Sequence, residues 1–333
     1  MHREKLFVDV GGAADGACHA RRLLALLAVD EFAVEEDTAV GRRYSDVMVY
    51  LHGFPDVAVH PTKLDFASRL PFKLAEAWLE QAPASKQQAA RDEVKSDLAF
   101  LAFNFGGVVG SDAEMAFFDK TVSQEVDDAV RVCEFDVGRL HVVGISTGAI
   151  IGSLLRAKHV ADTITVIAGL ADLQSGIRYD FTDDQMRQFD KGDACWKEFY
   201  LPDGCALPTN AIVSLDGEEQ ALPDQLAALV EIPRKVYLRL HHRYLDECVL
   251  EGREKGRLDI CSAVATPACP LLVIHGDADQ NVPFADGEQL FVAAAEPKQF
   301  VAIAKGNHLL TNSKHLKKAL QAILTHCRKR TTV

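Results

Sequence analysis

The sequence predicts an α/β fold in which a doubly wound, mostly parallel sheet carries a helical lid inserted between two late strands. Short apolar runs alternate with segments of helical periodicity along most of the chain. This alternation is typical of a parallel sheet whose crossover helices cover both faces. The alternation breaks between residues 172 and 266 and then resumes. With 333 residues, of which 48% are hydrophobic, the chain is long enough to bury a large core.

The first part of the chain begins with two apolar segments, residues 5–10 and 23–29, separated by a glycine-rich stretch. Their composition predicts two strands of an N-terminal antiparallel edge. Residues 46–51 and 98–104 are short apolar runs, which predict buried parallel strands. Between these runs apolar side chains recur at helical spacing, and a helix is expected to begin near Pro71.

The middle of the chain continues the alternation of strands and helices. Thr121-Val-Ser-Gln124 has the spacing of a capping box, and valines at helical spacing follow it. A strand is expected at residues 140–145, a helix at 146–158 and another strand at 163–168. Strands joined by helices in this way are expected to lie parallel.

The last part of the chain contains the insertion and the end of the sheet. Prolines and aromatic residues interrupt residues 172–266, and only residues 224–250 have strong helical character. The earlier pattern then resumes in four elements, which are the strands 270–275 and 299–304 and the helices 284–295 and 313–328. We therefore expect a core formed by residues 1–171 and 267–333 and a lid formed by residues 172–266.

One stretch between a strand and a helix is typical of a catalytic turn. Gly144-Ile-Ser146-Thr-Gly148 follows an apolar run and precedes small and apolar residues. A serine at such a sharp turn has strained backbone, and glycines are needed where chain segments nearly touch. The turn would lift the Ser146 hydroxyl clear of the sheet, beside the free amides of a helix N-terminus. The pattern predicts a nucleophile elbow.

Two later loops carry the other groups that such a serine needs, a histidine base and a carboxylate that orients it. Asp277 and Asp279 follow the strand at 270–275, and His308 follows the strand at 299–304. Each of these loops, like Ser146, stands at the end of an expected strand. The sequence therefore predicts a catalytic triad of Ser146, His308 and one of the two aspartates.

These motifs resemble those of serine hydrolases of the α/β-hydrolase superfamily. Gly144-Ile-Ser-Thr-Gly148 is similar to its nucleophile elbow, His275-Gly-Asp-Ala-Asp279-Gln-Asn-Val-Pro283 to its acid loop, and Gly306-Asn-His308 to its histidine loop. Within the superfamily, the turn at residues 104–112 and the position of the lid resemble the branch of small esterases, monoacylglycerol lipases and serine-aminopeptidase-like proteins.

The resemblance implies roles for individual residues. It favours Asp279 as the triad acid and leaves Asp277 to stabilise a turn. It also implies an oxyanion hole formed by the backbone N–H groups of Phe54, which follows His52-Gly53, and of Thr147.

The lid is expected to cover the active site, because it is inserted between two strands whose carboxyl ends face the Ser146 side, and ligands bind outside the carboxyl ends of strands in open α/β sheets. Its aromatic residues Trp196, Phe199 and Tyr244 are candidates for substrate binding, and an apolar lining would favour acyl or aromatic esters. The alternative is that these aromatic residues pack the lid onto the core.

The leading functional hypothesis is hydrolysis of a carboxylic ester or thioester with a small or medium acyl group, through an acyl-enzyme. A peptide bond is a less favoured substrate. The alternative is a catalytically weak protein of this fold that acts as a binding or assembly subunit, because fold alone does not establish function. We expect no cofactor and no metal site, since no metal-ligand spacing occurs. His52 and His275, at strand ends, are expected to brace loops.

Composition narrows the partners and the compartment. The formal net charge of −12 argues against nucleic-acid binding, which needs concentrated positive charge. Eight scattered cysteines form no disulfide framework, which favours a reduced, cytoplasmic setting. No apolar run is long enough to predict a membrane span. The expected partner is a small-molecule ester or thioester. The sequence leaves the oligomeric state open.

Overall fold

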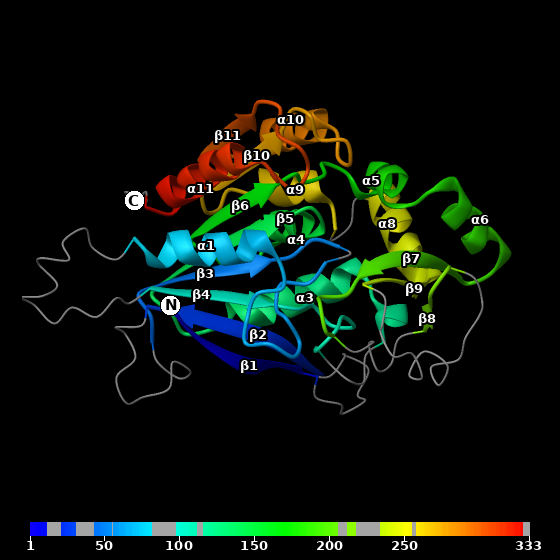
Figure 1. Cartoon of the computed structure of the whole chain (residues 1–333). Coiled ribbons are helices and arrows are strands. Elements are labelled where there is room, and N and C mark those ends of the chain that lie inside the picture. The colour runs from blue at the N-terminus through cyan, green and yellow to red at the C-terminus, as the bar shows by residue number, and fades with distance from the viewer. Residues whose placement is uncertain are drawn as a thin grey trace, which may run out of the picture.

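The computed structural model describes the chain except for a few segments; the described residues are 1–11, 21–30, 43–54, 56–81, 98–111, 116–205, 212–217, 234–254 and 258–328. Its centre is an eight-stranded sheet with the strand order β1-β2-β4-β3-β5-β6-β10-β11 (Figure 1). The strands are β1 (His2–Gly11), β2 (Arg21–Val29), β3 (Asp46–Leu51), β4 (Leu98–Phe103), β5 (Arg139–Ile145), β6 (Thr163–Ile167), β10 (Leu271–Gly276) and β11 (Lys298–Ile303).

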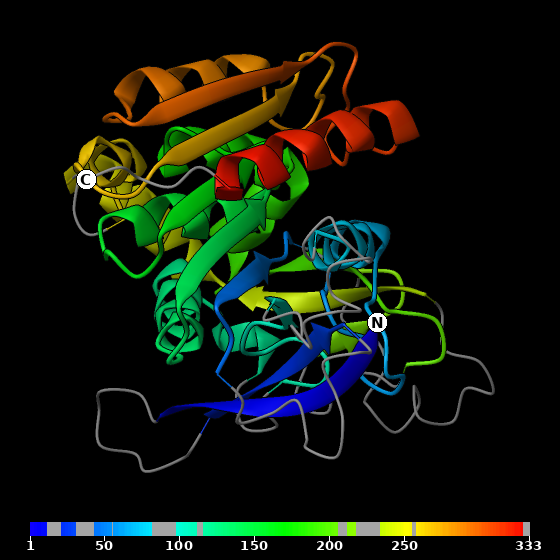
Figure 2. The same cartoon turned by 90° about the vertical axis from the view of Figure 1, so that its left-hand side faces the viewer.

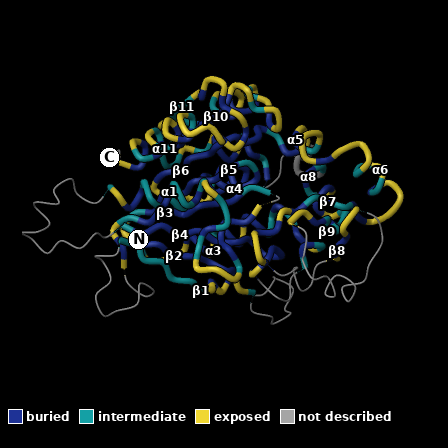
Figure 3. The backbone as a smooth tube through the Cα atoms, in the orientation of Figure 1, coloured by how far each residue is buried: buried dark blue, intermediate teal, exposed yellow. Residues whose placement is uncertain are grey.

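The sheet is antiparallel at one edge and parallel elsewhere. β1 pairs antiparallel with β2, and β2 pairs antiparallel with β4, which confirms the predicted N-terminal edge. All other neighbours are parallel. β3, β4, β5, β6 and β10 are buried along almost their whole length (Figure 3), because their apolar runs face helices on both sides. The predicted α/β class with a doubly wound sheet is confirmed.

Helices cover both faces of the sheet (Figures 1 and 2). One face is covered by α1 (Arg69–Leu79) and α11 (Ser313–Arg328), whose side chains Trp78 and Ile323 belong to one apolar cluster. The other face is covered by four helices, which are α3 (Val122–Cys133), α4 (Thr147–Arg156), α9 (Ile260–Ala265) and α10 (Phe284–Ala293). Val126 of α3 and Leu154 of α4 belong to the cluster on that side.

Local sequence explains where two of these helices begin. α1 begins two residues before the expected Pro71, which lies in its first turn, where a missing N–H costs nothing. The Thr121 side chain caps α3 by accepting from the Gln124 amide at 3.2 Å. The Gln124 side chain donates to Asp128 at 2.9 Å instead of returning to the Thr121 backbone. Of the predicted capping box, the contact made by the Thr121 side chain is therefore the half that forms.

The insertion between the neighbouring strands β6 and β10 contains strands as well as helices. Its elements before α9 are α5 (Leu173–Asp180), α6 (Asp183–Lys191), β7 (Ala194–Tyr200), β8 (Val213–Ser214), β9 (Lys235–His241) and α8 (His242–Glu254). β7, β9 and β8 form a small antiparallel sheet. Figure 1 shows these elements beyond the arrowheads of the parallel strands, where a lid was expected.

The expected helix at 224–250 is wrong for residues 235–241, which form β9. Val236, Leu238 and Leu240 are buried there and alternate with less buried residues, which is the period of a half-buried strand. Residues 224–233 lie outside the described residues.

A single buried arginine joins the end of the insertion to the core. Arg156, the last residue of α4, is 0% exposed. Its guanidinium donates to the carbonyl oxygens of Cys269 at 3.1 Å and Ala295 at 2.8 Å, and also to that of Val264. These carbonyls belong to the segment before β10, to the segment after α10 and to α9. Arg156 therefore fixes three chain segments at the point where the chain returns to the sheet.

Within the described residues, the structure contains no helix that is both long and apolar enough to cross a membrane.

Candidate active site

Ser146 stands alone between β5 and α4 in a backbone conformation that serine rarely adopts, with φ 54° and ψ −121°. Its amide donates to the Ile167 carbonyl at 3.0 Å, which ties the turn to the neighbouring strand. A Cβ added at Gly144 would lie 2.0 Å from the Gly148 carbonyl oxygen, and one added at Gly148 would lie 2.2 Å from that of Leu51. Only glycine fits at either position, and this steric limit explains the Gly-x-Ser-x-Gly spacing.

The structure brings Ser146, His308 and Asp279 together. His308 Nε2 lies 3.0 Å from Ser146 Oγ, and His308 Nδ1 lies 2.8 Å from Asp279 Oδ2. Since a carboxylate only accepts hydrogen bonds, Nδ1 carries the proton and Nε2 is left to accept from the serine hydroxyl. This arrangement of nucleophile, base and orienting acid is the one required to activate a serine.

Asp279 is held by its own loop as well as by histidine. Its side chain is 0% exposed. Oδ1 accepts from the amides of Asn281 at 2.8 Å and Val282 at 3.0 Å. Burial by itself would raise the pKa of Asp279, but hydrogen bonds from His275, His308 and the Val282 amide hold that pKa well below its usual range. Asp279 is therefore ionised wherever the protein is folded near neutral pH.

Asp277, the other candidate acid, does not contact His308 in the described structure. Its Oδ1 accepts from the Lys305 amide at 2.5 Å and so joins the acid loop to the histidine loop. The two loops also touch through backbone alone, since a Cβ added at Gly276 would lie 2.2 Å from the Gly306 carbonyl oxygen. Glycine at both positions lets the loops approach closely enough for Asp279 to reach His308.

Both residues proposed for the oxyanion hole, Phe54 and Thr147, lie close to Ser146. Thr147 is the first residue of α4, so its N–H is one of the amides that a helix leaves without an intrahelical partner. Phe54 lines the same cleft as Ser146. Gly53 brings the Phe54 segment against the elbow, because a Cβ added there would lie 2.9 Å from Ser146 Cβ.

His52 braces this segment. Its Nε2 accepts from the Phe105 amide at 3.2 Å, and its Nδ1 donates to the Gly53 carbonyl at 2.9 Å. Burial lowers the pKa of His52 to about 3, and the nearby charge of Lys120 acts in the same direction. An imidazole that is neutral near physiological pH thus ties Gly53 to the loop after β4.

Comparison of the sequence with known proteins finds only a short match. No protein-family model matches the sequence. A stretch of 40 residues is 45% identical to the uncharacterized protein YfhR of Salmonella typhi and of Salmonella typhimurium, and it covers 12% of this chain and only 14% of those relatives.

Solved structures resemble almost the whole chain. The mouse α/β-hydrolase domain-containing protein 10 has a TM-score of 0.58 at 12% identity, covering 97% of each chain. Est1E of Butyrivibrio proteoclasticus, solved with ferulic acid bound, has a TM-score of 0.56 at 16% identity, covering 97% of this chain and 100% of that one. The esterase domain of a Rhodothermus marinus protein has a TM-score of 0.53 at 16% identity, covering 97% and 96%.

The protein has the α/β-hydrolase fold. The predicted fold class is thereby confirmed, and identities this low establish the fold alone.

A cleft of about 780 Å³ is lined by residues of the core and of the insertion, which keeps the name lid given to it in the sequence prediction. Ser146 and His308 lie in the wall of this cleft. Its volume is in the usual range for small-molecule sites. The core contributes apolar residues such as Phe54 and Ile145 to the wall, together with polar residues such as Arg69 and Asn281. The lid side and the rim are more polar and include Tyr179, Asp180, Tyr200 and Arg234.

The three lid residues expected to bind substrate do not line this cleft. Phe199 is 0% exposed and packs edge-on against Phe117 at 5.9 Å between centroids. Trp196 lies against the guanidinium of Arg239 at 6.0 Å. Tyr244 packs against Phe181 at 6.2 Å. The alternative, that these aromatic residues pack the lid, describes them better.

The alternation of β7 explains why Phe199 does not line the cleft. Neighbouring residues of a strand point to opposite faces, so Phe199 enters the interior while Tyr200, which is 43% exposed, reaches the cleft. The sequence offered no motif that distinguishes Tyr179, Asp180, Tyr200 or Arg234 from other polar lid residues.

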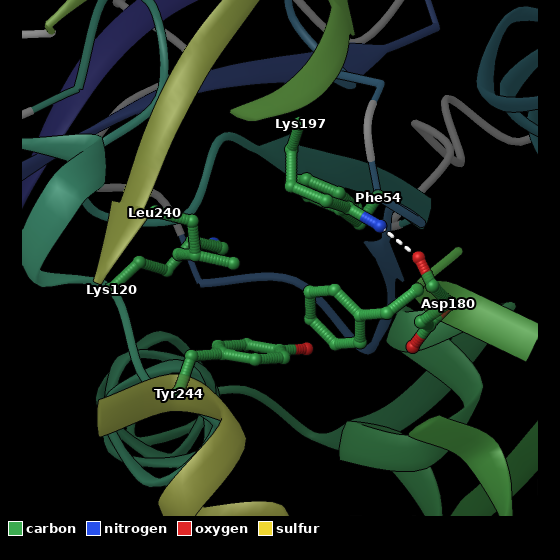
Figure 4. Close-up of a pocket in the computed structure, with 7 residues that line it drawn as sticks. Phe54, Lys120, Asp180, Lys197, Leu240 and Tyr244 are labelled. Carbon is green, nitrogen blue, oxygen red and sulfur yellow. Dashed lines mark hydrogen bonds between the residues drawn. The ribbon is translucent and has the colours of Figure 1, made fainter. Parts of the chain in front are cut away.

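A second, much smaller cavity lies behind Phe54, and Tyr244 is in its wall (Figure 4). Lys197 of β7 extends along the Phe54 ring, and its amino group donates to the Asp180 carbonyl (Figure 4). Burial lowers the pKa of Lys197, and the nearby charge of Asp180 opposes that shift. Lys197 thus joins the lid to the loop that carries one of the two proposed oxyanion amides.

The described residues contain no group of three or more His, Cys, Asp or Glu side chains that could hold a metal ion.

Proposed function

We propose that the protein is a serine hydrolase that cleaves a carboxylic ester or thioester with a small or medium acyl group. The observation that carries the proposal is the hydrogen-bonded chain from Ser146 Oγ to His308, at 3.0 Å, and from His308 to Asp279, at 2.8 Å. A protein that served only as a scaffold would not require these three side chains in this order.

In the proposed reaction, His308 Nε2 takes the proton of Ser146 while the serine oxygen attacks the acyl carbonyl. Asp279 keeps the imidazole in the required tautomer and stabilises the imidazolium that forms. The negative oxygen of the tetrahedral intermediate accepts from the amides of Phe54 and Thr147. His308 then returns the proton to the leaving alcohol or thiol, which departs and leaves an acyl-enzyme. Water, activated by the same histidine, releases the acid.

The cleft supports this substrate class. Phe54 and Ile145 give the cleft wall an apolar surface that suits an acyl group, and polar wall residues such as Tyr200 and Arg234 suit a polar leaving group. Each methylene buried against the apolar wall contributes about 0.8 kcal/mol until the wall is covered. Est1E, one of the structural neighbours, has been solved with ferulic acid, so aromatic acyl esters belong in the substrate series.

The proposal is tested by labelling the purified protein with a fluorophosphonate probe and by measuring p-nitrophenyl ester hydrolysis across acyl lengths. Ser146→Ala should abolish labelling and lower kcat by about 10⁴- to 10⁶-fold, because triad members act as a unit.

Ser153→Ala is the matched control, since Ser153 is a buried serine of α4, the helix that follows Ser146, and its hydroxyl donates to the Ala149 carbonyl at 2.8 Å. It should label like the wild type. A folded Ser146→Ala protein that kept most of the hydrolysis would overturn the proposal, and an unreactive wild type would favour a binding or assembly role.

A further inference from the structure

His275 is a fully buried imidazole that the proposed reaction does not use. It lies at the end of β10 and is 0% exposed. Its ring packs edge-on against Phe284 of α10, with centroids 5.8 Å apart. A Cβ added at Gly287 of the same helix would lie 2.4 Å from His275 Nδ1, so α10 can pass this ring only because residue 287 is glycine.

The Nε2 atom of His275 faces two acceptors, and both belong to the acid loop. It lies 3.0 Å from the Val282 carbonyl oxygen and 3.4 Å from Asp279 Oδ2. Nδ1 has no hydrogen-bond partner among the described residues. A proton on Nδ1 would be buried without an acceptor, whereas a proton on Nε2 meets two. The geometry therefore assigns His275 the neutral tautomer with the proton on Nε2.

This contact completes the surroundings of the triad carboxylate. Oδ1 of Asp279 takes two amides of its own loop. Oδ2 lies between two imidazoles, His308 at 2.8 Å and His275 at 3.4 Å. The same His275 N–H also holds the Val282 carbonyl, so it links the loop backbone to the oxygen that faces His308.

We propose that His275 is a positioning residue that orients Asp279 toward His308 and moderates how strongly the carboxylate attracts the His308 proton. The inference rests on the proposed serine-hydrolase function. His275 touches no substrate and acts only through Asp279. A donor on Oδ2 withdraws negative charge from the bond to His308, so loss of this donor should stabilise the His308 imidazolium.

The charged groups near this pair come from several elements. Asp180 of α5 interacts electrostatically with His308 from the lid. Asp286 of α10 is held by the Ala171 amide at 3.3 Å and the Tyr179 hydroxyl at 3.4 Å. Asp277 accepts from the Lys305 amide. All of these groups remain in every variant below, so a change in the titration of His308 would report the contact at residue 275.

The test measures two quantities in the full-length protein. NMR with labelled histidine follows the titration midpoint of His308, assigned with a His308→Gln variant, and steady-state kinetics with p-nitrophenyl butyrate give kcat and KM against pH. His275→Phe removes the donor but keeps the ring volume. His275→Gln keeps a donor, because its amide nitrogen is as many bonds from Cβ as Nε2.

His275→Phe should raise the His308 midpoint and move the acid limb of kcat/KM to higher pH. It should lower kcat about 10- to 100-fold with little change in KM, the size expected for a lost hydrogen bond to a charged group. His275→Gln should restore most of both. His141→Phe is the matched control, because His141 is a buried histidine of β5 that bonds Thr163 and Asp46. It should leave the midpoint unchanged.

Equal midpoints in wild type and folded His275→Phe would overturn the inference, as would equal impairment of the Phe and Gln variants with no change in midpoint. If His275→Phe does not fold, Gly287→Ala displaces the imidazole instead, and an unchanged midpoint in that variant is equally decisive. If the His308 midpoint changes with substitution of residue 275 but the wild type has no esterase activity, the inference stands and the proposed function is rejected.

Discussion

The loops at the carboxyl ends of the sheet and the lid above them are held in place by different kinds of contact. In the loops, backbone lies against backbone, with glycine where any Cβ would collide, as at Gly148 and Gly276. In the lid, side chains make the contacts, as Phe199 does on Phe117 and Lys197 does on Phe54. A backbone collision permits only one residue type, whereas a side-chain contact permits many, so the two regions should respond differently to substitution.

The largest difference is expected between the two aspartates of the acid loop. Asp279→Asn should lower kcat by about 10⁴-fold, because an amide donor at Oδ2 would favour the wrong His308 tautomer. Asp277→Asn should change kcat by less than about threefold, since an amide oxygen can still accept from the Lys305 amide. Kinetics at the pH optimum would check both, and the reverse ranking would show that the acid is Asp277.

A methyl group added at a core glycine should cost far more than one added in the lid. Gly148→Ala would place Cβ 2.2 Å from the Leu51 carbonyl oxygen, and we expect the free energy of unfolding to fall by more than about 3 kcal/mol. Gly192→Ala is the lid control, because the nearest atom to its Cβ would be 4.0 Å away. Its effect should stay within about 1 kcal/mol. Urea unfolding would measure both, and equal losses would contradict the proposed contrast.

The core loop near Phe54 should also make stability depend on pH. Burial lowers the pKa of His52 to about 3, below its unfolded value of about 6.5, so the unfolded state binds the extra proton. Stability from this group is complete above pH 6.5 and is lost progressively as pH falls toward 3. Between pH 6.5 and 5 the loss should be about 2 kcal/mol. Urea unfolding should show that the free energy of unfolding falls less with decreasing pH in His52→Phe than in the wild type. An equal dependence on pH in the two proteins would show that His52 is not the cause.

The smallest effect is expected for a lid residue that lines the cleft. Tyr200→Ala should raise KM about three- to tenfold and leave kcat nearly unchanged, because it removes a contact made equally with substrate and transition state. Trp196→Ala, on the same strand but outside the cleft wall, should leave KM unchanged. A change in KM for the Trp196 variant alone would instead show that Trp196 contacts the substrate, as the sequence predicted.

The core of this molecule could be predicted closely from its sequence because its constraints are local. Buried parallel strands need continuous apolar runs, and the elbow needs glycine at two positions around Ser146. The acid loop was harder, because the resemblance and not the spacing favoured Asp279 over Asp277. What distinguishes the two aspartates is a contact between loops nearly 30 residues apart in the sequence. In the structure, Asp279 Oδ2 lies 2.8 Å from His308 Nδ1.

The lid could not be predicted to the same degree. Lys235–His241 has charged and aromatic residues at positions that fit a helix as well as a strand, and pairing with β7 and β8 decides in favour of the strand. Phe199 and Tyr200 are adjacent aromatic residues, and only the register of β7 determines which one enters the cleft.

Arg156 holds the chain where it returns from the insertion to the sheet, and it does so through backbone atoms. Its guanidinium binds the backbone carbonyl oxygens of Val264, which lies in the last helix of the insertion, and of Cys269 and Ala295. These contacts hold the chain where it enters β10, the strand that pairs with β6 and leads to Asp279. We therefore expect a chimera that carries a different sequence between residues 172 and 259 to keep labelling by a fluorophosphonate probe while accepting a different set of esters.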